Sequence, residues 1–374
     1  MSKDTFSLKE MRNYKFRIYP DKEQEQNLTK WLEACRVIYN SALADRKNHY
    51  YRNGKGLTRI KQQVILKADK EKHDQVKAIH SQVAQEVLFR VERAFNNFFR
   101  RVKAGVKPGY PRYKGPGQYK SITYTQYGEG LGASFQNGTL KLSKIGLVKI
   151  IVHREIYGEI KTCTIKKEQS GKWYAVLAVE EYPVLYSPNC QAIGIDVGIK
   201  EFATLSNGET ISNPKHLVKS EKKLKTLQRS VFRKKKGSKN RIKAKKRLAR
   251  HHEKVRNQRK DFHHRVSSQL AWKYGKIAVE DLQIQNMVKN HNLAKSITDA
   301  GWGEFVSMLS YKAESAGREV TKVIPHGTSQ QCSRCGNIVK KDLSVRTHVC
   351  SYCGLVLDRD HNAAINILYK AKAS

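Results

Sequence analysis

The sequence predicts an α/β protein in which a small β-barrel or sandwich with a helical insert precedes a part of mixed strands and helices. Strand-like runs joined by turn residues gather between positions 139 and 181, behind two stretches of helical apolar spacing. From position 191 onward, short apolar strands alternate with helices. Together these patterns indicate an N-terminal β domain, interrupted by helices, and a C-terminal α/β domain.

The N-terminal elements follow from periodicity. Residues 12–19 alternate as a strand, and Pro20-Asp21 ends that strand and offers a helix N-cap. We expect this strand to complete the barrel from the far side of the helical insert. Helical spacing predicts helices from residue 28 to 42 and near 79–101, and the later strands are expected at 139–143, 148–153, 160–168 and 172–181.

The C-terminal part opens with residues 191–198, an apolar strand that carries one aspartate. Residues 201–211 are its expected hairpin partner, with Asn207-Gly208 in the turn. Two further strands and two helices complete this part, and a cysteine-rich segment lies between the last strand and the last helix. The strands are expected at 276–282 and 318–325, and the helices at 301–316 and 361–371.

Residues 215–260 form the most basic region, with 21 Lys and Arg against two acidic residues. Apolar residues recur there at intervals of three, four and seven, which predicts two long helices folding back at Gly237-Ser238. A disordered charged run is the alternative, and the apolar seam disfavours it.

The whole chain of 374 residues holds 72 Lys and Arg against 33 Asp and Glu, a formal net charge of +39. Such an excess favours a polyanionic partner, because neutralised phosphates release counterions. A ribosomal-type or merely basic surface is the alternative. No apolar run is long enough to span a bilayer and the N-terminus has no signal-peptide core, so no membrane partner is expected.

Four of the seven cysteines form two C-x-x-C pairs, each followed by glycine. Four thiolates at this spacing suit tetrahedral Zn²⁺ in a closed, structural site, and a redox pair is the weaker alternative. An odd total with clustered pairs indicates a reducing compartment, hence the cytoplasm of a bacterium or archaeon, or a nucleus-like location in a eukaryote. The expected zinc ligands are Cys332, Cys335, Cys350 and Cys353.

Three separated carboxylates are candidate catalytic residues: Asp196 within an apolar strand, Glu280 at the end of another and Asp360 at the start of a helix. Each alone could be an exposed strand end or a helix cap. Brought together they would repel one another unless a cation lay between them. Oxygen ligands suit Mg²⁺, and two such ions can promote hydrolysis of a phosphodiester. An actin-like ATPase, which also opens with strand, Asp and Gly, is disfavoured by the basic composition.

The motifs GIDVGIKEFATLSNG, VEDL, TSQQCSRCG and VCSYCGLVLDRDHNAAINIL, with KFRIYPDKEQEQNL and KPGYPRYKG before them, resemble the TnpB (OrfB-type) proteins of bacterial and archaeal insertion sequences. The resemblance covers nearly the whole chain. It implies a transposon-encoded, RNA-guided DNA endonuclease related to type V CRISPR effectors and Fanzor proteins, with a RuvC-like (RNase H-fold) nuclease domain. It also implies that Asp196, Glu280 and Asp360 are catalytic, that Arg346 assists them, and that Asp358 is a cap or supporting residue.

The resemblance further implies a domain plan. Residues 1–25 and 102–190 become a β-barrel wedge domain, 26–101 a helical recognition domain, 191–327 and 354–374 the nuclease domain, and 328–353 a zinc-binding insert. The expected partners are one guide RNA from the transposon end and duplex DNA with a short adjacent motif, bound by a monomer in a prokaryotic, nucleoid-associated setting. Expected nucleic-acid contacts are Lys15, Arg17, Lys107, Tyr110, Arg112, Tyr113, Lys114, Arg233, Lys234, Lys235, Lys236, Arg241, Lys245 and Lys246.

Two other classes of protein remain open at this point. One is a guided DNA-binding regulator that does not cut, and the other is a resolvase or transposase that uses the same fold without RNA. A transposase with tyrosine chemistry would need a paired-histidine site, and no such His-x-His pair stands in the sequence. All three acidic positions are present, which favours the nuclease over the regulator.

Overall fold

The computed structural model describes residues 9–136, 138–182, 190–342 and 345–373. The chain divides into two compact units, residues 1–182 and 183–374. Each unit has its own apolar core. Within the described ranges, no helix combines the length and apolar character that crossing a membrane requires.

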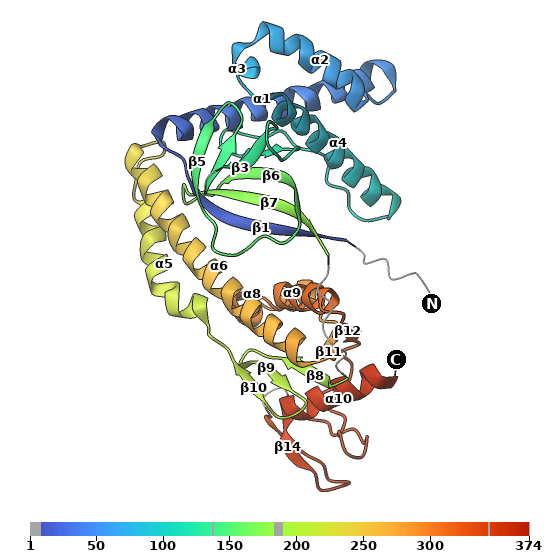
Figure 1. The fold of residues 1–374 in the computed structure, drawn as a ribbon. Helices are drawn as coiled ribbons and strands as arrows, with labels where there is room; N and C mark the ends of the chain where they lie inside the picture. Colours follow the sequence, from blue (N-terminus) through green and yellow to red (C-terminus); the bar gives the residue numbers. More distant parts are fainter. Residues whose placement is uncertain (1–8, 137, 183–189, 343–344, 374) are drawn as a thin grey trace. The chain divides into compact units, whose positions relative to one another are not determined.

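The first unit is built on one seven-stranded antiparallel sheet (Figure 1). Strand β1 (Glu10–Tyr19) lies inside this sheet, where it joins β7 to β5, so the expectation that this strand completes the sheet is confirmed. The strand order is β2 (Ser121–Tyr124), β6 (Glu159–Lys167), β7 (Trp173–Glu181), β1, β5 (Gly146–Ile151), β4 (Thr139–Leu142) and β3 (Ala133–Gln136). The short strands β2 and β3 were not expected, because four residues carry little periodicity.

Two long helices pack on this sheet, α1 (Lys22–Asn53) and α4 (Ser81–Lys103). Helix α1 begins where the sequence indicates, because Asp21 and Gln24 form a reciprocal capping box. Both predicted helices are confirmed and extend further than their apolar stripes. Helices α2 (Arg59–Lys72) and α3 (Asp74–Lys77) were missed, since their apolar faces are narrow and highly charged residues dominate them.

The second unit contains a five-stranded mixed sheet with the order β10 (Thr210–Ser212), β9 (Glu201–Leu205), β8 (Ala192–Val197), β11 (Lys276–Glu280) and β12 (Glu319–Val323). Strands β10, β9 and β8 are antiparallel neighbours. Strand β11 runs parallel to both β8 and β12. Four of these strands lie within the segments where the sequence predicts them, and β10 extends one residue beyond the predicted hairpin segment 201–211.

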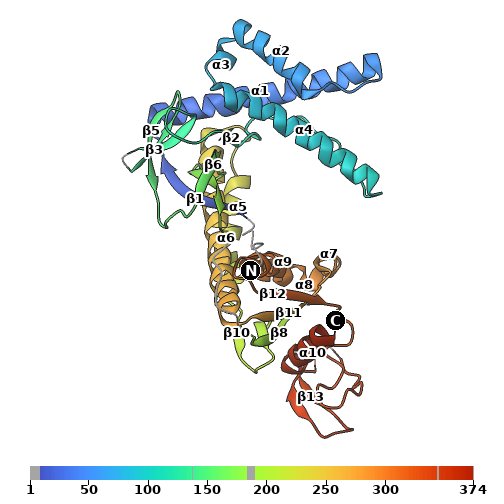
Figure 2. The ribbon, with the colours of Figure 1, turned by 45° about the vertical axis from the view of Figure 1, so that its right-hand side comes forward.

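Helices cover both faces of this sheet (Figures 1 and 2). On one face lie α6 (Lys239–Lys273), α8 (His291–Ala300) and α9 (Trp302–Ser315), which share the core of the unit. On the other face lies α10 (Arg359–Ala373). Helix α5 (His216–Phe232) packs against α6, so the predicted helical pair is confirmed, and its turn uses Gly237 in the left-handed region and Ser238 as N-cap.

Three small elements complete the second unit. Helix α7 (Ile284–Met287) precedes α8. Strands β13 (Thr347–Val349) and β14 (Val356–Asp358) pair as an antiparallel hairpin beside the cysteine pairs. This hairpin leads directly into α10, so the cysteine-rich segment and the last helix are continuous.

Candidate active site and metal centre

Asp196 and Glu280 lie at the ends of two neighbouring parallel strands. The register pairs Val279 with Ile195, so the next residues, Glu280 and Asp196, stand side by side. Side chains alternate across a strand. Ile195 and Val279 enter the core shared with α6 and α9, and Asp196 and Glu280 therefore face the opposite side, which α10 covers.

Helix α10 approaches β8 closely because Gly194 has no side chain. A Cβ atom at this position would stand 2.1 Å from the backbone oxygen of Ala364 and 2.9 Å from the Cβ of Leu368. The strand and helix can therefore touch backbone to backbone. This close approach places the first turn of α10, with Asp360, on the same face as Asp196 and Glu280.

Asp358, just before α10, and Asp360, in its first turn, have different roles. Asp358 Oδ1 accepts hydrogen bonds from the backbone N–H groups of Asp360 and His361, at 2.8 and 3.1 Å. Asp358 is thus the N-cap, which was one of the two roles expected for it. The carboxylate of Asp360 is held by arginines instead: Arg359 Nη2 lies 3.0 Å from Oδ1, and Arg346 Nη1 lies 3.6 Å from Oδ2.

The acidic groups repel one another. Burial raises the pKa of Asp196 well above its usual value, and the neighbouring carboxylates Glu280, Asp360 and Asp358 raise it further, while Arg359 lowers it. The pKa of Glu280 is also raised by burial, opposed by the hydrogen bond from Thr328 and by Lys370. A cation between these groups would relieve both the burial and the repulsion.

The donor set fits a hard divalent cation, since it consists of carboxylate oxygens on a desolvated face. Among the described residues, however, the carboxylates are not gathered within the tight sphere that the cysteines share. The three predicted residues therefore lie on one face, and the charges of Glu280 and Asp360 act on Asp196. Arg346 lies beside Asp360.

The four cysteine sulfurs form the second centre, with all ligand atoms within 4.8 Å of one another. The Sγ atoms of Cys332 and Cys353 are 3.6 Å apart, as are those of Cys335 and Cys350. Each pair closes a turn in which the glycine N–H donates to the first cysteine's carbonyl: Gly336 to Cys332 and Gly354 to Cys350, both at 2.9 Å. The arrangement is that of a closed, four-thiolate metal-binding cluster.

A buried row of polar residues on α10 binds the segment that leads into this cluster. Asn362 Oδ1 accepts from the N–H of Ser333 at 2.9 Å, and its Nδ2 donates to the carbonyl of Gln331 at 2.8 Å. Asn366 Nδ2 donates to the carbonyls of Thr328 and Gln331, at 2.8 and 2.7 Å. Both asparagines are buried. Their four-residue spacing on an otherwise apolar helical face was the available signal, and it was missed.

Thr328 is the other residue that the sequence did not single out. Its hydroxyl donates to Glu280 Oε1 at 2.6 Å, and it is buried. A threonine within the TSQQC run has no periodic pattern around it. Only the fold brings it under a carboxylate that lies 48 positions earlier.

The predicted nucleic-acid contacts at 107–114 form a loop that packs on α1 and α4. Tyr110 contacts Phe95 and Phe98 edge to face, and Lys47 Nζ lies 4.5 Å from the ring centre of Tyr113. The backbone of Lys114 is held by Asn40 and Arg36. Lys107, Arg112 and Tyr113 are exposed beside this anchored core.

Lys15 and Arg17 occupy the outer face of β1 and already have partners. Lys15 Nζ lies 3.0 Å from Glu168 and 4.0 Å from the ring centre of Tyr174. Arg17 donates to the carbonyl of Trp173 and lies over the rings of Tyr19 and Tyr174. Both side chains are therefore fixed in direction, on a face rich in aromatic rings.

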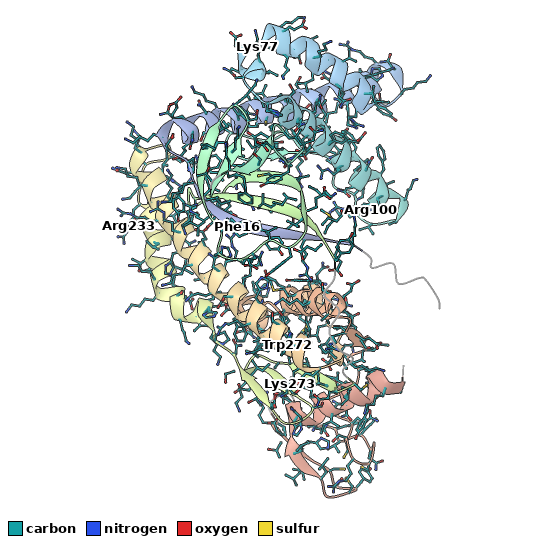
Figure 3. All side chains as sticks on the ribbon, in the orientation of Figure 1. Phe16, Lys77, Arg100, Arg233, Trp272 and Lys273 are labelled. Carbon is teal, nitrogen blue, oxygen red and sulfur yellow. The ribbon has the colours of Figure 1, made fainter. Side chains whose placement is uncertain are left out.

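The remaining predicted contacts gather at the turn between α5 and α6, where Figure 3 labels Arg233. Arg241 donates from Nη1 to the carbonyl of Lys234 at 3.2 Å and so stabilises the turn. The other side chains are exposed to solvent. They are Arg233, Lys235, Lys236, Lys245 and Lys246.

Comparisons with known proteins agree with this arrangement. A family model described as "Probable transposase" (OrfB, IS605) matches residues 178–291, and one described as "Cas12f1-like, TNB domain" matches 302–367. A third, described as a helix-turn-helix domain, matches 11–55, a range that here forms strand β1 and the single helix α1.

The chain is 35% identical to a protein of Streptomyces pristinaespiralis named "Putative RNA-guided DNA endonuclease", over 96% of this chain and 88% of that protein. It is 32% identical to "Putative RNA-guided DNA endonuclease InsQ" of Escherichia coli K12, over 96% and 92%. A solved Cas12f1–sgRNA–target DNA complex superimposes with a TM-score of 0.60 at 16% identity, covering 96% of this chain and 98% of that one.

The expected fold class is thereby confirmed: a RuvC-like (RNase H-fold) α/β domain with a cysteine-rich insert, preceded by a barrel-like sheet that carries helices. The chain belongs to the TnpB (OrfB-type) family.

Proposed function

We propose that this protein is a transposon-encoded RNA-guided DNA endonuclease that hydrolyses phosphodiester bonds at the face shared by Asp196, Glu280 and Asp360. One observation carries the proposal. Three carboxylates from positions far apart in the sequence lie on one face, where burial raises the pKa of Asp196 and the charges of Glu280 and Asp360 raise it further. A fold tolerates such repulsion where a cation is bound.

Asp196, Glu280 and Asp360 would hold Mg²⁺. Two ions would fit if a carboxylate binds both of them. When bound, such ions activate water and stabilise the leaving oxygen of a phosphodiester. The chain's own groups prepare the site: Thr328 fixes one oxygen of Glu280, and Arg359 neutralises one oxygen of Asp360. Arg346, half exposed beside Asp360, can donate to a phosphate that enters.

The four-cysteine cluster would hold Zn²⁺, because four thiolates leave no open coordination position for chemistry. This metal is structural. It holds the segment between β12 and α10 in place.

The proposed partners are one guide RNA from the transposon end and a duplex DNA with a short adjacent motif. The wedge domain would comprise residues 1–25 and 102–190, and the recognition domain residues 26–101. The nuclease domain would comprise residues 191–327 and 354–374, and the zinc-binding insert residues 328–353. The net charge of +39 supports binding to nucleic acid, and the relatives named as RNA-guided DNA endonucleases support the guided class. A monomer with one RNA is proposed.

The test begins with the RNA that copurifies with the protein. Its guide segment is sequenced, and a matching duplex is built with a randomised flank that reveals the adjacent motif. The parent complex should cut this duplex with Mg²⁺. Asp196→Asn should bind the duplex and lower the cleavage rate by on the order of 10³-fold or more. Asp281→Asn is the matched control, because Asp281 is an exposed carboxylate directly after Glu280.

Two results would reject the proposal. A parent complex that binds the duplex and leaves it intact is a guided regulator. Cleavage that persists after the RNA is removed identifies an RNA-independent resolvase or transposase. The presence of all three carboxylates, with Arg346 beside one of them, favours cutting over regulation.

A further inference from the structure

A chain of buried and part-buried hydrogen bonds leads from the carboxylate of Glu280 to Gln331, the residue before the first metal-binding cysteine. It starts at Thr328, whose hydroxyl donates to Glu280 Oε1 at 2.6 Å. The carbonyl of the same Thr328 accepts from Asn366, which also donates to the carbonyl of Gln331. Gln331 directly precedes Cys332, the first cysteine ligand.

The hydrogen bonds continue on the other side of Cys332. Asn362 donates to the carbonyl of Gln331 and accepts from the N–H of Ser333. The side chain of Asn362 therefore binds the backbone on both sides of Cys332, at the carbonyl of Gln331 and the N–H of Ser333. Asn362 and Asn366 are one turn apart on α10, the helix that also presents Asp360.

The side chains in this network are too buried to hydrogen-bond to water instead. Thr328, Asn366 and Asn362 are 4%, 5% and 0% exposed. An unmade hydrogen bond at such a position costs the desolvation of the group, so the network favours one geometry. Oε1 of Glu280 is consequently held in one direction by the Thr328 hydroxyl.

We propose that Thr328 is a positioning residue for the catalytic metal, which orients Glu280 and connects that carboxylate, through Asn366, to the cysteine cluster. The inference rests on the proposed function, because it concerns Glu280 as a metal ligand. Partners that orient metal-binding carboxylates typically contribute about 10–100-fold to metal affinity. The connection also means that the cysteine cluster, although closed, helps to set the geometry of the cutting site.

The test measures metal affinity without requiring activity. The full chain, loaded with zinc and freed of nucleic acid at high salt, is titrated with Mn²⁺, and free Mn²⁺ is followed by electron paramagnetic resonance. Thr328→Val removes the hydroxyl and keeps the shape, and Thr328→Ser keeps the hydroxyl. Asp196→Ala defines the signal of an abolished site. Thr321→Val is the matched control, since Thr321 lies on β12 and its hydroxyl contacts Glu319 instead.

The inference expects Thr328→Val to weaken Mn²⁺ binding by about tenfold or more, and Thr328→Ser to stay within about threefold of the parent. Thr321→Val should bind as the parent does. Zinc content should stay unchanged in all of these variants. Should Thr328→Val fold poorly, Asn366→Ala offers a second route, because it removes the support of Thr328 and should weaken Mn²⁺ binding in the same direction.

Several results would overturn the inference. If Thr328→Val binds Mn²⁺ as the parent does, or if the serine variant loses as much affinity as the valine variant, the hydroxyl does not position Glu280. A parent that binds Mn²⁺ no better than Asp196→Ala rejects the metal site itself. In a further outcome, the parent and the variants rank in Mn²⁺ affinity as expected while the parent leaves a guide-matched duplex uncut. That result supports the positioning role of Thr328 and rejects the nuclease function.

Discussion

The side chain of Asp358 caps the helix that presents Asp360: its Oδ1 accepts the backbone N–H of Asp360 at 2.8 Å. Two acidic residues that stand two positions apart thus have different tasks. One satisfies the open end of α10, and the other projects its carboxylate toward Arg346 and Arg359. The pair explains why acidic residues follow a metal-binding turn in a strongly basic chain.

This division predicts a clean separation of stability from activity. Asp358→Ala should lower the free energy of unfolding by about 1 kcal/mol, because an N-cap is removed, and Asp358→Ser should restore most of it. Asp360→Asn should leave stability nearly unchanged and abolish cleavage. Denaturant unfolding and a guide-matched cleavage assay on the three variants measure this. A full loss of cleavage in Asp358→Ser would contradict the division.

Asp196→Asn should make the Mg²⁺-free protein more stable. The pKa of Asp196 is raised in the folded state, so its ionised form is disfavoured there, and stability falls as the pH rises from the unfolded value of 3.8 through the folded value. At neutral pH the charge therefore costs free energy, and the amide removes that cost. The melting temperature should rise by about 2–4 °C for each kcal/mol recovered.

Mg²⁺ supplies the control for that prediction. Added Mg²⁺ should raise the melting temperature of the parent, because a ligand that binds only the folded state stabilises it. The same addition should hardly change Asp196→Asn. Equal stabilisation of both proteins by Mg²⁺ would mean that the ion binds elsewhere.

Gly194→Ala should separate α10 from the sheet. The added Cβ would lie 2.1 Å from the backbone oxygen of Ala364, a distance that only a shift of the helix can relieve. Overpacking of this kind costs about 1–3 kcal/mol or more, and it should abolish cleavage because Asp360 moves with the helix. Gly56→Ala is the control, since nothing lies within 4 Å of its Cβ position. Wild-type cleavage by Gly194→Ala would refute the close approach.

Removal of the cluster metal should unfold part of the second unit. Cys332→Ser should release the zinc of the cluster, and a structural zinc contributes on the order of 10 kcal/mol to folding. Protease cleavage should then increase within residues 328–358, whereas the first unit keeps its own transition. Cys163→Ser is a control for the substitution itself, because Cys163 is buried in the first unit's sheet and is far from the cluster in sequence. Unchanged zinc content in Cys332→Ser would reject the four-thiolate site.

The basic turn between α5 and α6 should determine part of the salt dependence. Replacing Arg233, Lys235 and Lys236 by Ala should lower the slope of log K against log salt by about 0.7–0.9 for each phosphate that the variant no longer neutralises. Binding is measured by filter retention at several salt concentrations, with RNA and with duplex DNA in turn. An unchanged slope for both would show that the turn binds neither nucleic acid.

The sequence predicts the main strands and the four clustered cysteines well, for a physical reason. Strands β8 and β11 are short apolar runs that each carry one carboxylate near the end, and the four-cysteine spacing is set by the turn geometry of the ligands. What the sequence could not supply is the packing of distant segments. Thr328 and Asn366 matter only because α10 lies on β8, and that packing depends on the absent side chain of Gly194.

The place of β1 shows the same limit. Its alternation marks a strand with one buried face, but alternation is identical for a central and an edge strand. Pairing with both β7 and β5 is decided by sheet closure over residues 130 or more positions away. Helices α2 and α3 escaped notice because charge dominates their sequences, although Leu66 and Val76 are buried.

The separation of the three carboxylates along the chain has a consequence for synthesis. Asp360 follows Asp196 by 164 positions, and α10 must dock on β8 before the third carboxylate reaches its place. A product whose translation stops after α6 and before α10 retains the basic α5–α6 pair and lacks the residue that completes the site. If the three carboxylates form the proposed site, such a product should therefore be unable to cleave DNA.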